Sequence, residues 1–150
     1  MLGKRGEGWV AIQGLLLLAV FISPLLESYP LPIGLRVLGL LLGVIGGALA
    51  LAAMLGLGAS LTAFPKPKAG GQLVTAGAYG LVRHPIYSGV ILGSFGWSLL
   101  FSSPFGLVLS VVLLIFFDLK SRREERWLTE AYPAYPAYQR RVKKLVPWIY

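Results

Sequence analysis

The chain contains no cysteine, only one histidine and only six acidic residues in a length of 150. Without cysteine it can form neither a disulfide bond nor a thiolate metal site. One histidine and six carboxylates are also too few ligands to predict a metal centre. Charged residues make up 13% of the sequence, well below the roughly 25% that is usual in a soluble domain. The composition therefore argues against a metal centre and against a soluble globular protein.

Apolar residues are abundant instead. Hydrophobic residues make up 56% of the chain, and its mean hydropathy is +0.72. A length of 150 residues allows one domain, residues 1–150. Three long stretches carry no charged side chain: Trp9–Leu26, Val37–Ala63 and Ile86–Phe117. Because a membrane-spanning helix needs about 20 mostly apolar residues, this pattern predicts an all-α integral membrane protein.

The last uncharged stretch is too long for a single crossing. As one helix its 32 residues would measure about 48 Å, whereas the hydrocarbon core of a bilayer is about 30 Å thick. Ser102-Ser103-Pro104 lies near its middle and predicts a turn between two helices. We therefore expect about four transmembrane helices, the third and fourth forming a hairpin, with a re-entrant pair as the alternative. The predicted spans are residues 9–27, 34–63, 85–102 and 104–118.

Two segments lie outside these spans. Residues 64–84 begin with a run of prolines, lysines and glycines, which prevents a regular helix. Composition alone leaves open whether this segment is an ordered surface loop or a flexible linker. Residues 119–150 are basic and aromatic. Within them Trp127, Leu128 and Ala131 repeat at helical spacing, which predicts a C-terminal amphipathic helix at the membrane interface.

The net charge of +8 could indicate a nucleic-acid partner, but the basic residues cluster beside the apolar stretches. Attraction to anionic lipid headgroups explains this better, so we expect membrane lipids and no nucleic acid as partners. The first span has the basic start of a signal peptide, including Lys4, but no small-residue cleavage site follows it. We therefore expect this span to stay uncleaved as a membrane helix. With four spans, every basic residue except Arg36 falls on the side of both termini and of residues 64–84. We therefore predict a protein of a prokaryotic plasma membrane with a cytoplasmic loop 64–84, a cytoplasmic tail 119–150 and both termini cytoplasmic.

Titratable residues stand at both ends of the predicted hairpin. Arg83-His84-Pro85 precedes the third span and Glu124-Glu125 follows the fourth, so a hairpin brings them to the same membrane face. Proline is favoured at the first position of a helix, which predicts that Pro85 begins the helix and His84 caps it. The amino end of that helix could bind an anion, or His84 could simply cap it while Arg83 snorkels to the interface. Adjacent glutamates point about 100° apart, so only one faces inward, unless both belong to a solvated charged surface.

Further strings accompany these two in a fixed order. The set comprises Leu73-Val74-Thr75-x-Gly77-x-Tyr79, Arg83-His84-Pro85-x-Tyr87-x-Gly89, the apolar hairpin, Glu124-Glu125-x-x-Leu128, and a tail with Tyr135-x-x-Tyr138-x-x-x-Val142 before Pro147. In this order and spacing, residues 71–147 resemble the isoprenylcysteine carboxyl methyltransferase and phospholipid methyltransferase group of membrane proteins. Each string alone is weak evidence for this family, whereas the ordered set, which covers roughly half of the chain, is fairly specific for it.

The resemblance implies S-adenosylmethionine as the cofactor, with S-adenosylhomocysteine as its product. The positions that match the family's cofactor contacts are Gly71, Gln72, Leu73, Val74, Tyr79, His84, Pro85, Ile86, Tyr87 and Glu124. Glu124 corresponds to the acidic cofactor ligand, and Glu125 to a structural partner. Lys120 stands where the prenylcysteine enzymes carry an arginine associated with the substrate, so it is the candidate catalytic residue. Lysine keeps the positive charge but lacks the bidentate geometry that suits a carboxylate.

The resemblance therefore implies methyl transfer to a small lipophilic or lipid-like acceptor at the cytoplasmic membrane boundary. The accepting group could be a carboxylate, an amine or a thiol, because no residue identifies it. Such a transfer demands alignment and exclusion of water and needs no catalytic cysteine. The alternative is a non-catalytic membrane scaffold or ligand-binding protein of the same fold. A transporter or channel has the least support, because the apolar stretches carry no charged residue to line a path.

Overall fold

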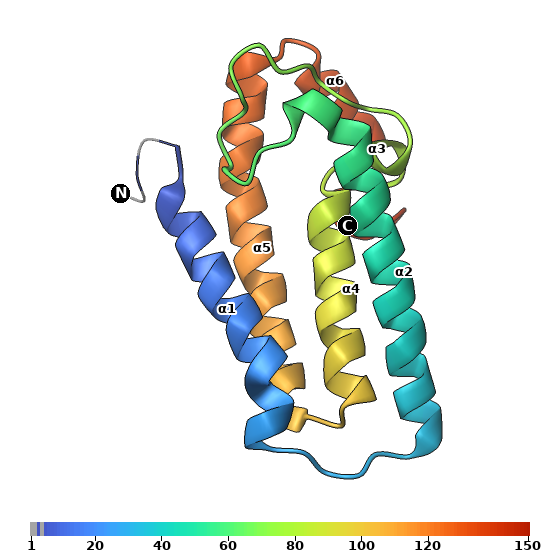
Figure 1. Cartoon of the computed structure of the whole chain (residues 1–150). Helices are drawn as coiled ribbons and strands as arrows, with labels where there is room; N and C mark the ends of the chain where they lie inside the picture. The colour runs from blue at the N-terminus through green and yellow to red at the C-terminus, as the bar shows by residue number, and fades with distance from the viewer. Residues whose placement is uncertain (1–2, 4) are drawn as a thin grey trace.

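The computed structural model describes residue 3 and residues 5–150, so Lys4, one of the basic residues counted above, lies outside the described residues. In the described part the chain is helical and has no strand, only an isolated parallel bridge between Val82 and Lys143. The elements are α1 (Glu7–Leu26), α2 (Ile33–Leu57), a 3₁₀ turn (Gly58–Ser60), α3 (Ala78–Leu81), α4 (Pro85–Leu100), α5 (Pro104–Ala131) and α6 (Tyr135–Arg141) (Figure 1). The predicted all-α fold is confirmed.

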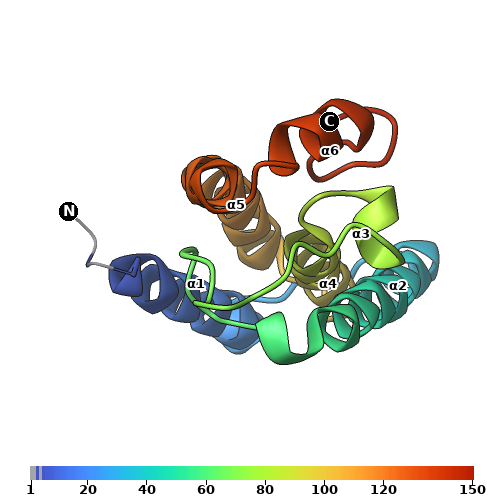
Figure 2. The ribbon, with the colours of Figure 1, turned by 90° about the horizontal axis from the view of Figure 1, so that it is seen from above.

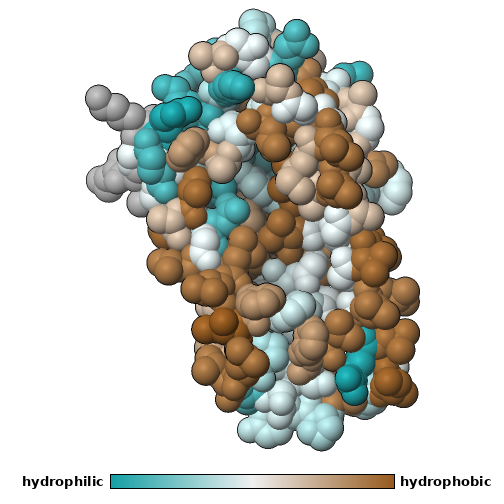
Figure 3. Space-filling model, viewed as in Figure 1, coloured by the Kyte–Doolittle hydropathy of each residue, from teal (hydrophilic) through white to brown (hydrophobic). Residues whose placement is uncertain are grey.

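Four helices, α1, α2, α4 and α5, run along the length of the molecule (Figure 1). Three of them, α1, α2 with its 3₁₀ turn, and α5, are long and apolar enough to cross a membrane, while α4 is a shorter apolar helix of 16 residues. Exposed leucine, isoleucine and valine side chains cover the outside of these helices, whereas hydrophilic side chains gather mainly near the end that carries α6 (Figure 3). An apolar exterior of this extent suits lipid rather than water. The predicted membrane fold is therefore confirmed.

Facing glycines bring α2 and α4 close together. A Cβ atom added at Gly46 would lie 2.5 Å from the carbonyl oxygen of Gly89, and one added at Gly96 would lie 2.6 Å from that of Gly39. No side chain fits between the two backbones at these points, so both crossings require glycine. This packing fixes α4, which begins at the proline of the Arg-His-Pro string, against α2.

The predicted turn between the third and fourth spans is confirmed. α4 ends at Leu100 and α5 begins at Pro104, whose missing amide hydrogen suits the first helical position. The side chain of Ser103 caps α5 by accepting a hydrogen bond from the backbone nitrogen of Gly106 at 3.0 Å. Ser103 also donates to Ser23 of α1 at 3.2 Å, which ties the first helix to the hairpin inside the apolar region.

α5 is longer than the predicted fourth span. It continues past residue 118 to Ala131, because no glycine or proline interrupts the chain before Pro133. The interfacial repeat of Trp127 and Leu128 is therefore the last part of α5 rather than a separate helix, and the short α6 follows it. This extension carries Glu124 beyond the apolar part of the bundle, to the level of the loop.

The loop and the C-terminal tail close one end of the bundle. Seen from above, the loop after α2 reaches across to α1 and returns to α3, while α6 lies beside α5 (Figure 2). The backbone nitrogens of Arg83 and His84 donate to the carbonyl oxygens of Lys143 and Lys144, at 2.7 and 3.1 Å. The tail is therefore hydrogen-bonded along the segment that leads into α4.

Candidate functional site

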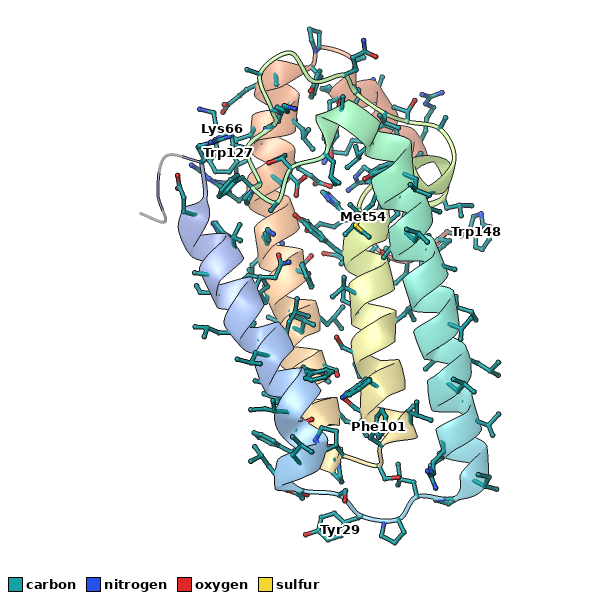
Figure 4. All side chains as sticks on the ribbon, in the orientation of Figure 1. Tyr29, Met54, Lys66, Phe101, Trp127 and Trp148 are labelled. Carbon is teal, nitrogen blue, oxygen red and sulfur yellow. The ribbon has the colours of Figure 1, made fainter. Side chains whose placement is uncertain are left out.

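A cavity of about 360 Å³ lies at the closed end of the bundle. Its walls come from α1, α2, the loop after α2, α3, α4, α5 and α6. Met54 of α2, labelled in Figure 4, lies on its wall below the loop. The volume falls within the range of about 300–1,000 Å³ that holds small-molecule ligands. This cavity is therefore the candidate binding site.

Most of the predicted site residues come together around this cavity. Those that line it are Gln72, Leu73, Val74, Tyr79, His84, Ile86, Tyr87, Lys120 and Glu124. Gly71 lies just outside, where an added Cβ atom would be 3.2 Å from Tyr132 Oη, so glycine lets the loop lie close to the end of α5. Pro85 is fully buried as the first residue of α4. Gly71 and Pro85 therefore shape the site without lining the cavity.

Glu125 is buried and joins α5 to the segment before α4. Its Oε1 accepts a hydrogen bond from Arg83 Nε at 2.8 Å and lies 3.0 Å from His84 Nε2. Its Oε2 accepts from Gln139 Nε2 of α6 at 3.0 Å. Arg83 also donates to the backbone oxygen of Val142 in the tail at 2.5 Å. Both oxygens of this carboxylate are used inside the protein, so Glu125 holds the site together rather than facing a ligand.

Glu124 lines the cavity, unlike its neighbour. Its Oε2 accepts the hydroxyl of Tyr87 at 2.5 Å and lies 3.8 Å from His84 Nδ1. Its Oε1 receives no hydrogen bond from the described residues. The side chain is 23% exposed, because the rotation of about 100° between adjacent helical residues turns the two glutamates in different directions. Its free oxygen can accept a hydrogen bond from a ligand hydroxyl or ammonium group.

The ring of Tyr87 lies between the charged groups of the site. It stacks on the ring of His84 at 5.3 Å and on that of Phe117 at 4.6 Å, measured between centroids. The Lys120 ammonium lies 5.0 Å from the centroid of the same ring, which is a cation–π contact. Tyr87 therefore fixes the carboxylate of Glu124 and the ammonium of Lys120 relative to each other.

Lys120 lines the cavity although only 1% of the residue is exposed. Its ammonium donates to Gln13 Oε1 of α1 and forms no ion pair with a described carboxylate. An ammonium has three N–H donors, so this group has hydrogen bonds to offer a ligand. The sequence did not predict Gln13 as a site residue. The one signal for it was an amide within an almost wholly apolar stretch.

Three tyrosines form an aromatic wall of the cavity: Tyr79, Tyr135 and Tyr138. Tyr138 Oη donates to the backbone oxygen of Tyr79 at 2.6 Å and so fastens α6 to α3. Burial raises the pKa of Tyr138 to about 12 and raises that of Tyr79 as well, so both phenols keep their protons at neutral pH. Tyr135 and Tyr138 were matched as part of the tail, but their spacing did not indicate that α6 folds against the cavity.

We expect the two glutamates to differ in their effect on stability. Glu125→Ala leaves Arg83 and His84 buried without their carboxylate and should lower the free energy of unfolding by about 3 kcal/mol. Glu124→Ala breaks one hydrogen bond, from Tyr87, and should lower it by about 1 kcal/mol. Unfolding in detergent, followed by the fluorescence of the four tryptophans, measures both changes. Equal losses, or a larger loss for Glu124→Ala, would contradict this division of roles.

Two curated proteins are similar to about half of the chain. A stretch of 76 residues, 50% of this chain, is 34% identical to the cobalt-zinc-cadmium resistance protein CzcN of Cupriavidus metallidurans and covers 35% of that protein. A stretch of 80 residues, 52% of this chain, is 34% identical to protein-S-isoprenylcysteine O-methyltransferase B of Arabidopsis thaliana and covers 41% of it. The chain therefore matches less than half the length of either relative. Among the described residues, no group of three or more histidine, aspartate or glutamate side chains is placed to hold a metal ion.

The family comparison covers more of the chain. The sequence profile of the phospholipid methyltransferase family matches residues 35–135, which include nearly all of α2, the loop, the hairpin and most of the cavity wall. The resemblance drawn from the ordered strings is thereby confirmed. The chain belongs to the phospholipid methyltransferase family.

Proposed function

We propose that the chain is an S-adenosylmethionine-dependent methyltransferase that methylates a lipophilic acceptor at the cytoplasmic boundary of the membrane. The observation that carries this proposal is the cavity, which joins the motif residues His84, Tyr87 and Glu124 to a buried lysine at one end of an apolar bundle. One relative is named as an enzyme that methylates isoprenylcysteine in proteins, which supports a lipophilic acceptor.

The residues around the cavity suit S-adenosylmethionine, which carries ribose hydroxyls, an ammonium group, a carboxylate and a sulfonium. Glu124 offers an oxygen that can accept from the ribose or the ammonium. The ring of Tyr79, which lines the cavity, offers an aromatic face for a cation. The buried Tyr135 hydroxyl, which meets no partner among the described residues, is a further polar group at the cavity. When bound, S-adenosylmethionine supplies a methyl group on its sulfonium sulfur, which a nucleophile takes in one displacement that leaves S-adenosylhomocysteine.

The contribution of the chain is to align the reactants and to keep water out. Gln72, Leu73 and Val74 line the cavity from the loop. The loop is itself held against the start of α1, where the Arg5 guanidinium lies 4.8 Å from the centroid of the Phe64 ring. Alignment and removal of water are the main requirements of such a displacement. A covalent enzyme intermediate is not needed, so a chain without cysteine is sufficient.

The arrangement of the helices supports lateral access of the acceptor from the bilayer. α1 packs on α4 and α5, and α2 packs on α4, but no Cα atom of α1 lies within 8 Å of a Cα atom of α2. An apolar groove of about 480 Å³ is lined by Leu17 and Phe21 of α1 and by Val90 and Trp97 of α4, and the rings of Phe21 and Trp97 stack on each other. Gln13, one helical turn from Leu17, already lines the cavity. An apolar tail in the groove would therefore place its head group at the cavity.

Lys120 and Gln13 mark the position proposed for that head group. The ammonium of Lys120 has donors to offer, and the amide of Gln13 adds a second polar group beside it. A positive charge attracts an anionic head and repels an ammonium. Among the three possible accepting groups, the site therefore favours a carboxylate or a thiolate over a protonated amine.

We expect S-adenosylhomocysteine to bind and to stabilise the protein by about 2.7 kcal/mol at a hundredfold excess over its dissociation constant. Glu124→Ala should raise that constant roughly tenfold, because a charged hydrogen-bond acceptor is lost. Glu130→Ala is the matched control, since it removes an exposed carboxylate of the same helix that does not line the cavity. Isothermal titration calorimetry in detergent measures the affinity of the unsubstituted, Glu124→Ala and Glu130→Ala proteins for S-adenosylhomocysteine.

Absence of binding to the folded, unsubstituted protein would contradict the proposed cofactor. Equal affinities for the Glu124→Ala and Glu130→Ala proteins would contradict the role of Glu124 while leaving the cofactor in place.

We also propose that the loop and both termini face the cytoplasm, because the basic residues gather at that end of the molecule. Lys66 of the loop and Tyr29 lie at opposite ends of the molecule (Figure 4). In a chain without cysteine, Lys66→Cys and Tyr29→Cys each introduce a single thiol. A membrane-impermeant maleimide should label Tyr29→Cys in intact cells and Lys66→Cys only after permeabilisation. The reverse pattern would contradict this orientation.

A further inference from the structure

Tyr135, the first residue of α6, has a hydroxyl group that the protein itself does not use. The residue is 1% exposed, and no described residue forms a hydrogen bond with its hydroxyl. Tyr87 and Tyr138, which also line the cavity, donate to Glu124 Oε2 and to the backbone oxygen of Tyr79. Buried polar groups in folded proteins nearly always have a partner. The Tyr135 hydroxyl is therefore a candidate for a bond to a ligand.

The surroundings of Tyr135 restrict the charge of that ligand group. Its ring packs edge-on against that of Tyr138 at 5.8 Å, and the charged groups that act on it are Glu125, Arg83 and Glu124. Arg83 and Glu125 are paired with each other at 2.8 Å. Arg83 also lines the cavity, but its guanidinium is bonded to Glu125 and to the backbone oxygens of Gln139 and Val142. Of these three charged groups, Glu124 is therefore the one that lines the cavity with an oxygen left for a ligand. A second carboxylate brought to this place would be repelled by Glu124, whereas a neutral oxygen or nitrogen would not.

The hydroxyl is available as a donor. Burial and the carboxylate of Glu125 raise the pKa of Tyr135 well above its usual value, so the phenol keeps its proton at neutral pH. A protonated phenol donates one hydrogen bond. The position of the Tyr135 hydroxyl and the charges around it therefore favour a neutral hydrogen-bond acceptor on the ligand.

We propose that the Tyr135 hydroxyl donates a hydrogen bond to the nucleoside part of the bound methyl donor, at a ribose oxygen or a ring nitrogen. This inference rests on the proposed function. The neutral acceptors of S-adenosylmethionine all belong to its nucleoside, since its remaining acceptor is a carboxylate. Tyr135 is then a binding residue that the C-terminal tail contributes to the site.

The test uses Tyr135→Phe, which removes the hydroxyl and keeps the ring. Without ligand, this variant should unfold at the same temperature as the unsubstituted protein or above it, because no bond inside the protein is lost. Its dissociation constant for S-adenosylhomocysteine should rise roughly fivefold. The constant for 5′-methylthioadenosine, which has the nucleoside but no carboxylate, should rise by a similar factor. Tyr150→Phe is the control, because its hydroxyl donates to Asp118 outside the cavity, and both constants should stay unchanged.

Four results would overturn the assignment of Tyr135. Unchanged affinities for both ligands, or a lower unfolding temperature without ligand, would show that the hydroxyl has no bond to the donor or already has a partner in the protein. If Tyr135→Phe weakened the binding of S-adenosylhomocysteine but not that of 5′-methylthioadenosine, the hydroxyl would be bonded to the carboxylate of the ligand and not to its nucleoside. Failure of 5′-methylthioadenosine to bind the unsubstituted protein would count against the nucleoside contact. If the unsubstituted protein binds neither ligand, the proposed function itself fails, which is a separate outcome.

Discussion

The candidate site depends on the buried carboxylate of Glu125. Its bonds to Arg83, His84 and Gln139 join three segments that are far apart in the sequence: the residues before α4, the end of α5, and α6. Taking one member out of such a cluster leaves the others buried without compensation, so the three segments hold together as a unit. Arg83 extends the junction to the tail through the backbone oxygen of Val142. The cavity takes its walls from the elements that meet here.

Next to this junction, two opposite charges face the cavity without pairing. Lys120 and Glu124 are one turn apart on α5, a spacing at which an ion pair often forms. Here the ring of Tyr87 comes between them, because its hydroxyl donates to Glu124 and its face carries the Lys120 ammonium. Each charge is therefore free to meet a different ligand. That separation suits the proposed function, in which the site holds a polar methyl donor beside a lipophilic acceptor.

The sequence was sufficient to predict the helices and the hairpin, and nine of the eleven residues predicted for the site line the cavity. Uncharged stretches mark membrane helices, Pro104 favours a helix start, and adjacent glutamates on a helix must point in different directions. The contribution of the tail to the cavity wall could not be predicted, because Tyr135 comes to the cavity only through the folding of α6. Gln13 was also missed, because it meets Lys120 across the bundle from a helix outside the family match. The continuation of the fourth predicted span into the tail as one helix was not predicted, because hydropathy marks the expected membrane boundary whereas the helix continues to Ala131, shortly before Pro133.

We propose that methyl groups are transferred to lipophilic acceptors in this cavity. The most direct measurement incubates the purified protein with methyl-labelled S-adenosylmethionine and matched acceptors: palmitate, hexadecylamine and hexadecanethiol beside butyrate, butylamine and butanethiol. We expect label in at least one long-chain product, far less in its short-chain homologue, and loss of that label in Lys120→Ala protein. Absence of label from every acceptor, with folded protein that still binds S-adenosylhomocysteine, would contradict the claim and leave a ligand-binding membrane protein of the same fold.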